Sequence, residues 1–310
     1  MRTISVETGS ANALTISELS LGCMRINKLA SAEMDALLTA CLDVGITCFD
    51  HADIYGKGRS EEVFAASVAR LGLARESMLL QSKCGIRPAE GTFDFSGEHI
   101  LASVDGILSR LNTDYLDVLL LHRPDALVEP DEVAEAFGRL QASGKVRHFG
   151  VSNQNPTQVE LLQRALPQRL VFNQLQLSIA FTPLIDAGIH VNNKDDFAVM
   201  RDGGALDSCR LRNITVQAWS PFQYGLFEGV FLDNPKFPEL NTVIDRIAHE
   251  RDATNTAVAV AWISRHPARI QTILGTTTPQ RIRDAAQSQD FQLTRQEWYE
   301  IYRAAGNVLP

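Results

Sequence analysis

Four polar residues lie at or just beyond the ends of short apolar runs: Asp50, Tyr55, Lys83 and His122. A tyrosine hydroxyl has an ordinary pKa of about 10, which is too high for easy proton donation near neutral pH. A neighbouring lysine ammonium favours the tyrosinate and lowers that pKa, and a carboxylate beside the lysine holds it charged and oriented. A histidine opposite can hold a carbonyl oxygen by a hydrogen bond. Together these groups predict protonation of a carbonyl oxygen as hydride reaches the carbonyl carbon.

Each of these residue types is more often structural when it stands alone, so the functional interpretation depends on all four meeting at one place. His51 and Arg123 flank two of them. Because alternate residues of a strand face opposite sides, we expect both side chains to point away from the catalytic residues, and neither is assigned a catalytic role. The other histidines show no ligand spacing. We therefore predict no metal site.

The elements that would position these residues are eight short apolar runs that alternate with amphipathic helical patterns. The runs are Leu19–Met24, Ile46–Asp50, Met78–Lys83, Tyr115–His122, Val146–Ser152, Leu170–Gln176, Ile214–Ser220 and Ile270–Gly275. The helical patterns include Ser31–Val44, Arg59–Leu71, Gly97–Leu111, Pro130–Ala142 and Pro156–Leu166. Eight such alternations predict a (β/α)8 TIM barrel, in which chemistry sits at the carboxyl ends of the strands. A doubly wound sheet is the competitor, but its Gly-x-Gly-x-x-Gly turn is absent after the first run.

Three segments fall outside the alternation. Thr3–Ser17 alternates around Gly9-Ser10-Ala11-Asn12 and predicts an N-terminal β-hairpin cap on the barrel floor. Ser178–Asn213 predicts a long functional loop with one short helix near residues 205–211. Thr294–Ala305 predicts a C-terminal helix. We expect one domain over residues 1–310, with extended C-terminal loops, and a substrate pocket built from four loops: Arg25–Leu29, Ile86–Phe95, Ser178–Asn213 and Pro221–Phe231.

Composition narrows the function classes. The chain has 310 residues and a formal net charge of −8, which argues against nucleic-acid binding because phosphate backbones need a basic surface. No apolar run approaches the roughly 20 residues that span a bilayer, and the N-terminus lacks a signal peptide's apolar core. The five cysteines form no Cys-x-x-Cys pair. They predict reduced thiols in a cytoplasmic protein. With the acidic net charge and the short apolar runs, we expect neither nucleic-acid nor membrane binding.

The order of these motifs resembles the aldo-keto reductase superfamily. The resemblance is carried by Phe49-Asp50-x-Ala52-x-x-Tyr55-Gly56, Ser82-Lys83, Leu121-His122-x-Pro124, Gly150-Val151-Ser152-Asn153, Asn173-Gln174 and Trp219-Ser220-Pro221. It spans essentially the whole chain. Ala218-Trp219-Ser220-Pro221-Phe222 and Thr294-Arg295-Gln296-Glu297-Trp298 resemble the YdhF-type branch of bacterial oxidoreductases. The resemblance implies a catalytic tetrad of Asp50, Tyr55, Lys83 and His122 on a barrel that uses NADP(H).

The resemblance also implies which residues bind the cofactor. Ser152, Asn153 and Gln174 would hold the nicotinamide carboxamide, and Trp219 would stack on the nicotinamide ring. Asp50 and the segment Gly22, Cys23 and Met24 would border the nicotinamide end. The pyrophosphate would follow Ser220, Pro221, Phe222 and Leu226.

The segment Gly275-Thr276-Thr277-Thr278-Pro279 ends the last run and opens a helix. Thr278 suits the N-cap and Pro279 the first turn. A helix N-terminus with hydroxyl groups favours an anion, and Arg281 adds a guanidinium for a phosphate, which favours NADP over NAD. Gly275, Thr276, Thr277 and Arg281 are therefore the expected 2′-phosphate residues. Many family members have lysine in place of Gly275 and asparagine in place of Ala285, which predicts a weaker preference for that phosphate.

The sequence thus predicts an NADPH-dependent oxidoreductase that reduces an aldehyde or ketone to an alcohol, with Tyr55 as general acid. The alternative is a cofactor-binding regulatory subunit with little turnover. A third interpretation is a Schiff-base aldolase with Lys83 as the nucleophile. The pairing of Asp50 with Tyr55 argues against it. The substrate itself is a small carbonyl compound that no motif in the loops identifies.

Overall fold

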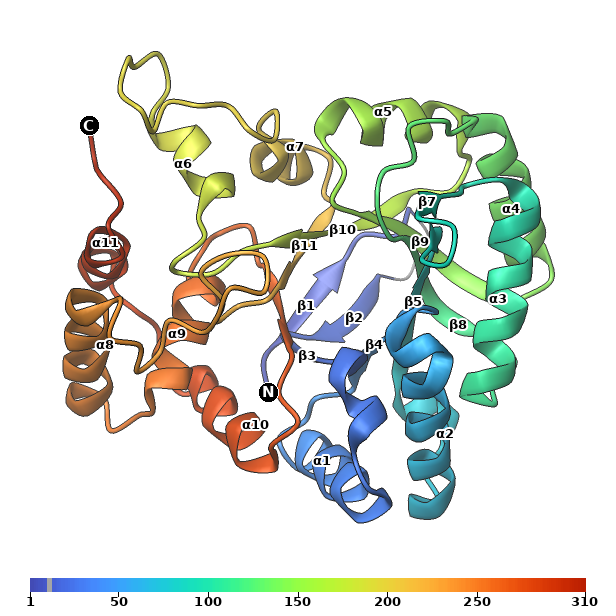
Figure 1. The fold of residues 1–310 in the computed structure, drawn as a ribbon, viewed down its shortest axis with the longest axis horizontal. Coiled ribbons are helices and arrows are strands. Elements are labelled where there is room, and N and C mark those ends of the chain that lie inside the picture. Colours follow the sequence, from blue (N-terminus) through green and yellow to red (C-terminus); the bar gives the residue numbers. More distant parts are fainter. Residues whose placement is uncertain (10–12) are drawn as a thin grey trace.

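Eight parallel strands close into a barrel surrounded by helices in the computed structural model, which describes residues 1–9 and 13–310 (Figure 1). The barrel strands, in spatial order, are β3 (Leu19–Gly22), β4 (Cys48–Asp50), β5 (Leu79–Cys84), β8 (Leu116–Leu121), β9 (Val146–Ser152), β10 (Leu170–Gln176), β11 (Thr215–Trp219) and β12 (Gln271–Leu274). All eight predicted runs become barrel strands. The (β/α)8 prediction is confirmed.

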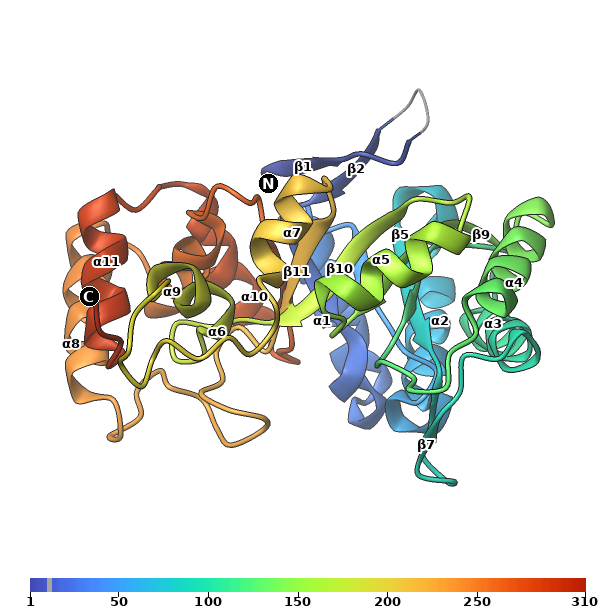
Figure 2. The same cartoon turned by 90° about the horizontal axis from the view of Figure 1, so that it is seen from above.

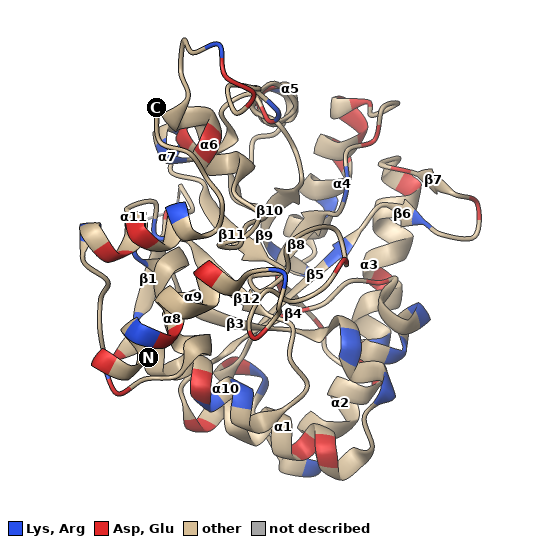
Figure 3. Cartoon of the chain, turned by 60° about the vertical axis from the view of Figure 1, so that its left-hand side comes forward, with Lys and Arg blue, Asp and Glu red and all other residues tan. Residues whose placement is uncertain are grey.

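The helices of the outer ring follow their strands in chain order. They are α1 (Ser31–Asp43), α2 (Arg59–Leu71), α3 (Gly97–Leu111), α4 (Pro130–Ala142), α5 (Pro156–Ala165), α7 (Ala205–Leu211), α9 (Asn255–Ser264) and α10 (Pro279–Ala286). Their starts have local causes: Ser96 caps α3 through the His99 N–H, and Asn155 forms a capping box with Gln158 on α5. On the face shown in Figure 3, residues of both charges are interspersed on α1, α2 and α10, while the barrel strands carry few charges.

The N-terminal hairpin covers the floor of the barrel, as predicted. Strands β1 (Thr3–Val6) and β2 (Leu14–Ser17) pair antiparallel, and the predicted turn at residues 10–12 lies outside the described part of the chain. Ile4, Val6 and Ile16 bury their side chains against residues that begin the barrel strands, such as Leu79. Figure 2 shows the hairpin at one end of the barrel and β7 (Thr92–Phe93) at the other.

Several elements differ from the sequence-based expectation. The insertion between β10 and β11 holds two short helices, α6 (Pro183–Ile189) and α7, whereas one was predicted. The loop after β5 forms a small hairpin of β6 (Ile86–Arg87) and β7 (Thr92–Phe93), which was not predicted. Helices α8 (Pro238–Glu250) and α9 were also missed, whereas the C-terminal helix was predicted and is α11 (Arg295–Ala304). Helix α9 is buried all round, so its sequence lacks the polar face that makes a helical pattern recognisable.

The start of α10 corrects one local detail. Pro279 occupies the first turn as expected, but the Thr278 side chain makes no capping hydrogen bond. Instead, the Thr276 hydroxyl accepts a hydrogen bond from the Thr278 N–H at 3.1 Å. The preceding loop therefore orders the helix start, and the Thr278 hydroxyl is not used for the cap.

Candidate active site

Asp50, Tyr55 and Lys83 meet at the carboxyl end of the barrel. The Lys83 Nζ donates to both Asp50 carboxylate oxygens, at 2.7 and 2.8 Å, to the His51 carbonyl oxygen at 2.8 Å, and lies 3.3 Å from the Tyr55 hydroxyl. Lys83 is 0% exposed and Asp50 is 2% exposed. Strands β4 and β5 are hydrogen-bonded neighbours, so their carboxyl ends bring the carboxylate and the ammonium together.

Tyr55 reaches the mouth on a tight left-handed turn. After Tyr55, residues Gly56, Lys57 and Gly58 all have positive φ, at 58°, 57° and 86°. A Cβ on Gly56 would lie 2.7 Å from the Cβ of Asn27. Glycine is therefore required directly after the tyrosine, because both the backbone conformation and the available space exclude a side chain.

The acidity of Tyr55 differs in part from the prediction. Burial raises the pKa of Tyr55 above its ordinary value, and the charge of Lys83 opposes that rise. The lysine thus acts in the expected direction, but the net pKa shift in the structure is upward because desolvation is the larger effect. Burial alone would lower the pKa of Lys83, yet Asp50 and Tyr55 hold that pKa above its usual value. The ammonium therefore stays charged beside the phenol.

His122 lies across the mouth from Tyr55. The two rings meet edge to face with their centroids 5.9 Å apart. Burial, with the nearby charges of Lys83 and Arg123, holds the pKa of His122 well below its usual value. The imidazole is therefore neutral near pH 7. It can donate one N–H hydrogen bond to a substrate oxygen, but it is not itself a source of protons.

The side chains of Arg123 and His51 lie in different places, although we expected both to point away from the other site residues. His51 points away from the mouth and packs edge to face on Phe64, with ring centroids 4.7 Å apart. Arg123 instead places its guanidinium over the Trp219 ring, 5.5 Å from the ring centroid. The expectation that Arg123 points elsewhere is wrong, because β8 ends at Leu121 and strand alternation no longer governs the residues beyond it.

The residues expected to hold a nicotinamide carboxamide form one cluster. The Trp219 indole N–H donates to the Asn153 side-chain oxygen at 3.2 Å, and the Asn153 amide donates to the Ser152 hydroxyl at 2.7 Å. Asn153 and Ser220 both have positive φ, at 58° and 53°. Such backbone strain in residues other than glycine is concentrated at functional sites.

Gln174 is only partly free for such a role. Its amide nitrogen donates to Asp50 at 3.1 Å and to Gln217 at 3.1 Å, inside the barrel. Its side-chain oxygen is the group that remains to accept a hydrogen bond from a carboxamide. The side chain thus belongs mainly to the barrel interior, which the sequence did not predict.

The remaining expected cofactor residues border the mouth or the loops around it. Gly22 ends β3 opposite Asp50, and Cys23 is buried, with its thiol directed to the Leu21 carbonyl oxygen at 3.6 Å. The rest are partly or fully exposed, apart from the buried Pro221: Met24, Ser220, Phe222, Leu226, Gly275, Thr276, Thr277 and Arg281.

Arg25 is a candidate cofactor residue that the sequence assigned only to a pocket loop. Its guanidinium donates to the Gly275 carbonyl oxygen at 3.0 Å. It therefore adds a cation to the β12–α10 loop. A Cβ on Gly275 would lie only 3.1 Å from the Arg25 Nη1 atom. No sequence signal pairs residues 25 and 275, because the contact joins the first and last strands of the barrel.

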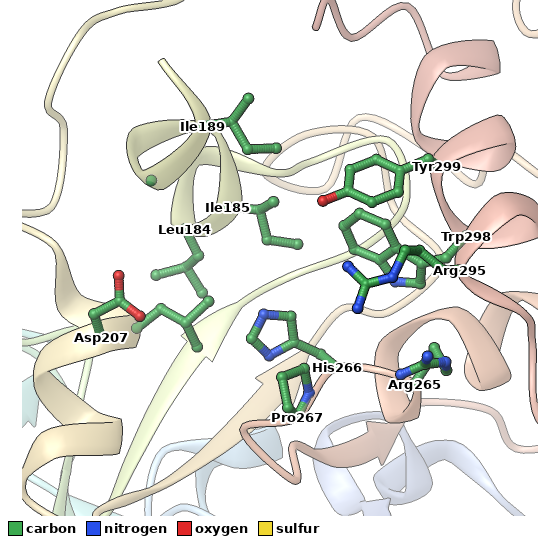
Figure 4. Close-up of a pocket in the computed structure, with 12 residues that line it drawn as sticks. Leu184, Ile185, Ile189, Asp207, Arg265, His266, Pro267, Arg295, Trp298 and Tyr299 are labelled. Atoms are coloured by element: carbon green, nitrogen blue, oxygen red, sulfur yellow. The ribbon is translucent and has the colours of Figure 1, made fainter. Parts of the chain in front are cut away.

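A separate cavity of about 390 Å³ lies away from this mouth. Its lining comes from α6, α7, the segment after α9 and α11, and includes Ile185, His266 and Trp298 (Figure 4). None of the four tetrad residues lines it. It is therefore distinct from the candidate active site.

The closed parallel barrel, with a lysine, a carboxylate and a tyrosine joined at its mouth, is the architecture of a barrel oxidoreductase. The chain belongs to the Aldo/keto reductase family, whose model matches residues 18–305.

Known relatives agree with this assignment. The uncharacterized oxidoreductase YcsN of Bacillus subtilis is 38% identical over 306 residues, which cover 95% of this chain and 96% of the relative. Oxidoreductase YdhF of Escherichia coli is 35% identical over 284 residues, 89% of each chain, so the predicted similarity to YdhF-type proteins is confirmed. The 6-dehydroglucose reductase of Agrobacterium fabrum is 34% identical over 307 residues, 95% of this chain and 96% of the relative.

Among solved structures, an aldo-keto reductase from Klebsiella pneumoniae in complex with NADPH superposes with a TM-score of 0.75. It is 25% identical, and the match covers 98% of this chain and 95% of that chain. Within the described residues of the present structure, no helix has the length and apolar character needed to cross a membrane.

Proposed function

We propose that this protein reduces an aldehyde or ketone to an alcohol with NADPH, and that Tyr55 is the proton donor. The observation that carries the proposal is the position of the Lys83 Nζ between the Asp50 carboxylate and the Tyr55 hydroxyl. This buried ammonium stabilises negative charge on the phenol oxygen, which develops as the proton leaves.

The residues around the mouth have side chains suited to nicotinamide adenine dinucleotide phosphate. Arg25 and Arg281 are exposed cations beside the β12–α10 loop, and Thr276 and Thr277 add hydroxyl groups near the N-terminus of α10. This combination of donors suits a phosphate group. At the other end of the mouth, Trp219 offers an aromatic ring at the end of β11. The reduced nicotinamide, when bound there, supplies the hydride.

The chain's own residues perform the other parts of the reaction. His122, which is neutral, donates a hydrogen bond that orients the carbonyl oxygen toward the Tyr55 hydroxyl. Tyr55 gives its proton to the oxygen as the alkoxide forms, and Lys83 stabilises the resulting phenolate. Because an alkoxide is a stronger base than a phenolate, the transfer is favourable even though the pKa of Tyr55 is raised by burial. Asp50 holds the ammonium in place throughout.

The regulatory alternative has relatives of its own but weaker support. A putative voltage-gated potassium channel subunit beta of Schizosaccharomyces pombe is 26% identical over 276 residues, which cover 80% of this chain. The oxidoreductases are more similar, at 34–38% identity. The complete Asp50, Tyr55, Lys83 and His122 set favours turnover, since binding a cofactor alone does not need a proton donor.

The aldolase interpretation conflicts with the geometry. A Schiff-base lysine must be neutral and must reach the substrate. Lys83 is fully buried, its Nζ donates to three acceptor atoms, and its pKa is raised. The amine therefore stays protonated, and its hydrogen-bond donors are occupied by these acceptors.

The substrate class is a small carbonyl compound. Arg123 beside Trp219 and the partly buried Phe222 give the entrance both a cation and an apolar surface. The Agrobacterium relative is named for the reduction of 6-dehydroglucose. This supports a polar carbonyl substrate as the first class to assay.

Replacement of the proton donor tests the proposal. Tyr55→Phe should lower the rate of NADPH oxidation with a carbonyl substrate by about 10²- to 10⁴-fold, the usual contribution of a general acid. NADPH binding, followed by nucleotide fluorescence, should be nearly unchanged because the ring remains. Tyr115→Phe removes a phenol far from the mouth and is the matched control. Normal turnover in Tyr55→Phe would show that another group is the acid.

A further inference from the structure

Four glutamines form a polar layer across the interior of the barrel. Gln174, Gln217 and Gln271 are paired in register on β10, β11 and β12, and Gln81 on β5 is paired with Asp50 on β4. Gln81, Gln217 and Gln271 are 0% exposed, and Gln174 is 3% exposed. Layers inside such barrels are usually filled by branched apolar side chains, so four adjacent amides need an explanation.

The upper part of this layer holds the tetrad carboxylate. The Gln81 Nε2 donates to the Asp50 Oδ1 at 2.6 Å, and the Gln174 Nε2 donates to the same oxygen at 3.1 Å. Both amides also donate to the Gln217 Oε1, at 3.0 and 3.1 Å. One carboxylate oxygen thus accepts two amide hydrogen bonds in addition to the one from Lys83.

The lower part anchors these amides to the floor. The Gln217 Nε2 donates to the Gln81 Oε1 at 3.0 Å and to the Gln271 Oε1 at 2.7 Å. The Gln271 Nε2 donates to the backbone carbonyl of Ser17 at 2.7 Å, at the end of the N-terminal hairpin. Gln217 thereby makes all four hydrogen bonds that an amide can make.

The two groups at the ends of this hydrogen-bonded series of glutamines determine how every amide in it is oriented. The ionised Asp50 carboxylate and the Ser17 carbonyl can only accept hydrogen bonds, so Gln81, Gln174 and Gln271 must turn their N–H groups toward them. Gln217 must then present its oxygen to Gln81 and Gln174 and its nitrogen to Gln271. Inversion of one amide would leave buried groups unpaired, which is costly in a low-dielectric interior.

This arrangement acts on the chemistry through Asp50. The two amide hydrogen bonds and the one from Lys83 fix the Asp50 Oδ1 atom in one position. Without the amides, the carboxylate would be free to rotate, and it would no longer hold the Lys83 Nζ beside the Tyr55 hydroxyl. A displaced ammonium would stabilise a negative charge on Tyr55 less.

We propose that Gln81 and Gln217, anchored through Gln271 to the hairpin, are positioning residues that hold the Asp50 carboxylate in place and aimed at Lys83. Gln174 supports the same carboxylate from the neighbouring side. This inference deepens the proposed function and rests on Tyr55 being the proton donor. Within the described part of the chain, the Tyr55 hydroxyl is hydrogen-bonded to Lys83 and to none of these four amides, so they act on it through Asp50 and Lys83.

The test compares the glutamine beside Asp50 with the glutamine at the barrel floor. Gln81→Met keeps the length of the side chain but removes the donor to Asp50, whereas Gln271→Met makes the same change at the floor and is the matched control. Single-turnover NADPH oxidation in Gln81→Met should be slowed about tenfold, the value of one hydrogen bond to a charged group. Its alkaline limb should move to higher pH, because an ammonium held less firmly beside the phenol leaves the phenol less acidic. Gln271→Met should change both quantities less.

A structural role alone predicts a different result. Both variants would then lose thermal stability to a similar extent, with the pH limb of hydride transfer unmoved, and this result would overturn the proposal. If Gln81→Met does not fold, Gln81→Asn retains an amide but withdraws it by one methylene, and it should move the limb in the same direction.

A second measurement separates this inference from the proposed function. An ultraviolet titration of the phenolate, with Tyr55→Phe subtracted, reports the ionisation of Tyr55 without turnover. A shift to higher pH in Gln81→Met would support the positioning role even if wild-type protein reduced no carbonyl compound. An unmoved Tyr55 titration in an otherwise active enzyme would refute the positioning role and leave the reductase proposal intact.

Discussion

Asp50 at the mouth of the barrel and Asp117 near its floor are two buried carboxylates that meet cations in different ways. Asp50 pairs with one lysine that is itself fully buried. Asp117 pairs with Arg75 at 2.7 Å and with Arg147 at 3.0 Å, and about half of the Arg147 side chain is exposed. Both carboxylates also accept a hydrogen bond from a neighbouring strand or side chain, so neither is left unpaired.

The difference lies in what the cation touches next. The Lys83 Nζ lies 3.3 Å from the hydroxyl of Tyr55, a group that can ionise at the mouth. Arg75 and Arg147 instead both lie over the Tyr115 ring, with their guanidinium carbons 3.9 and 3.8 Å from its centroid. A ring face attracts the cations and gives a rigid stack, but it exposes no proton to transfer. The same pair of charges is therefore placed beside an ionisable group at one end of the barrel and beside an aromatic ring face at the other.

The largest expected effect follows from removal of the buried ammonium. Lys83→Met should lower turnover at least about 100-fold, since Tyr55 loses its charge stabilisation. It should also cost about 3–5 kcal/mol in the free energy of unfolding, because Asp50 is left buried without its cation. Steady-state kinetics and urea denaturation measure the two losses.

A double variant distinguishes these losses. Lys83→Met combined with Asp50→Asn removes both charges and should recover part of the stability but none of the turnover. Turnover of Lys83→Met within about tenfold of wild type would contradict a role for this ammonium in proton transfer.

A smaller and purely structural effect is expected at the floor. Asp117→Asn should lower the free energy of unfolding by about 1–2 kcal/mol, since it weakens charged hydrogen bonds to two partly exposed arginines. The Leu80 N–H, which donates to the Asp117 Oδ2 at 2.9 Å, keeps an acceptor in this variant. The rate of hydride transfer should be unchanged. A fall in that rate comparable with that of Lys83→Met would erase the distinction between the two ends.

A third effect concerns acid pH and compares a histidine from each region. Burial, with the charge of Lys83, lowers the pKa of His51 to about 3, and neither ring nitrogen has a hydrogen-bond partner among the described residues. Because the unfolded chain takes up this proton near pH 6.5, the stability contributed by neutral His51 is present above that pH. It is lost as the pH falls from about 6.5 toward 3.

His51→Phe should therefore flatten the decrease of unfolding free energy between pH 7 and pH 4 by about 1–3 kcal/mol, as each unit of pKa difference is worth about 1.4 kcal/mol. His148 lies near Asp117 and is only partly buried. Burial lowers its pKa, but the Asp117 carboxylate opposes this, so the decrease is smaller than that of His51. His148→Gln is the control and should flatten the curve less. Denaturation curves at each pH would refute this account if the two variants behaved alike.

Much of the fold was predictable because it depends on local patterns. The eight strands appear as short apolar runs, and helices such as α2 and α3 show an apolar face with polar residues opposite. The tetrad was also predictable as a set, since parallel strands in a closed barrel bring their carboxyl ends to one mouth. The prediction was weakest where no amphipathic contrast exists, as in α9, whose residues 257–263 are all buried.

Other features were decided by contacts between distant strands. The amide chain joins β5, β10, β11 and β12 to the N-terminal hairpin, so no local pattern in the sequence shows that Gln81 meets Gln217 or that Gln271 meets Ser17. Arg123 was misplaced because a rule for strands was applied beyond the end of β8. The net pKa shift of Tyr55 was missed because desolvation depends on how the whole barrel encloses the ring.

The order of residues alone thus determined which side chains are present at the strand ends and which proton-transfer chemistry they allow. The tertiary structure decided how strongly each group is buried, which amides hold Asp50, and which cations approach Trp219 and Gly275. The physical reason is that side-chain identity and periodicity are local properties of the chain. Desolvation and hydrogen-bond partnership arise only after barrel closure brings together strands that lie up to about 250 residues apart.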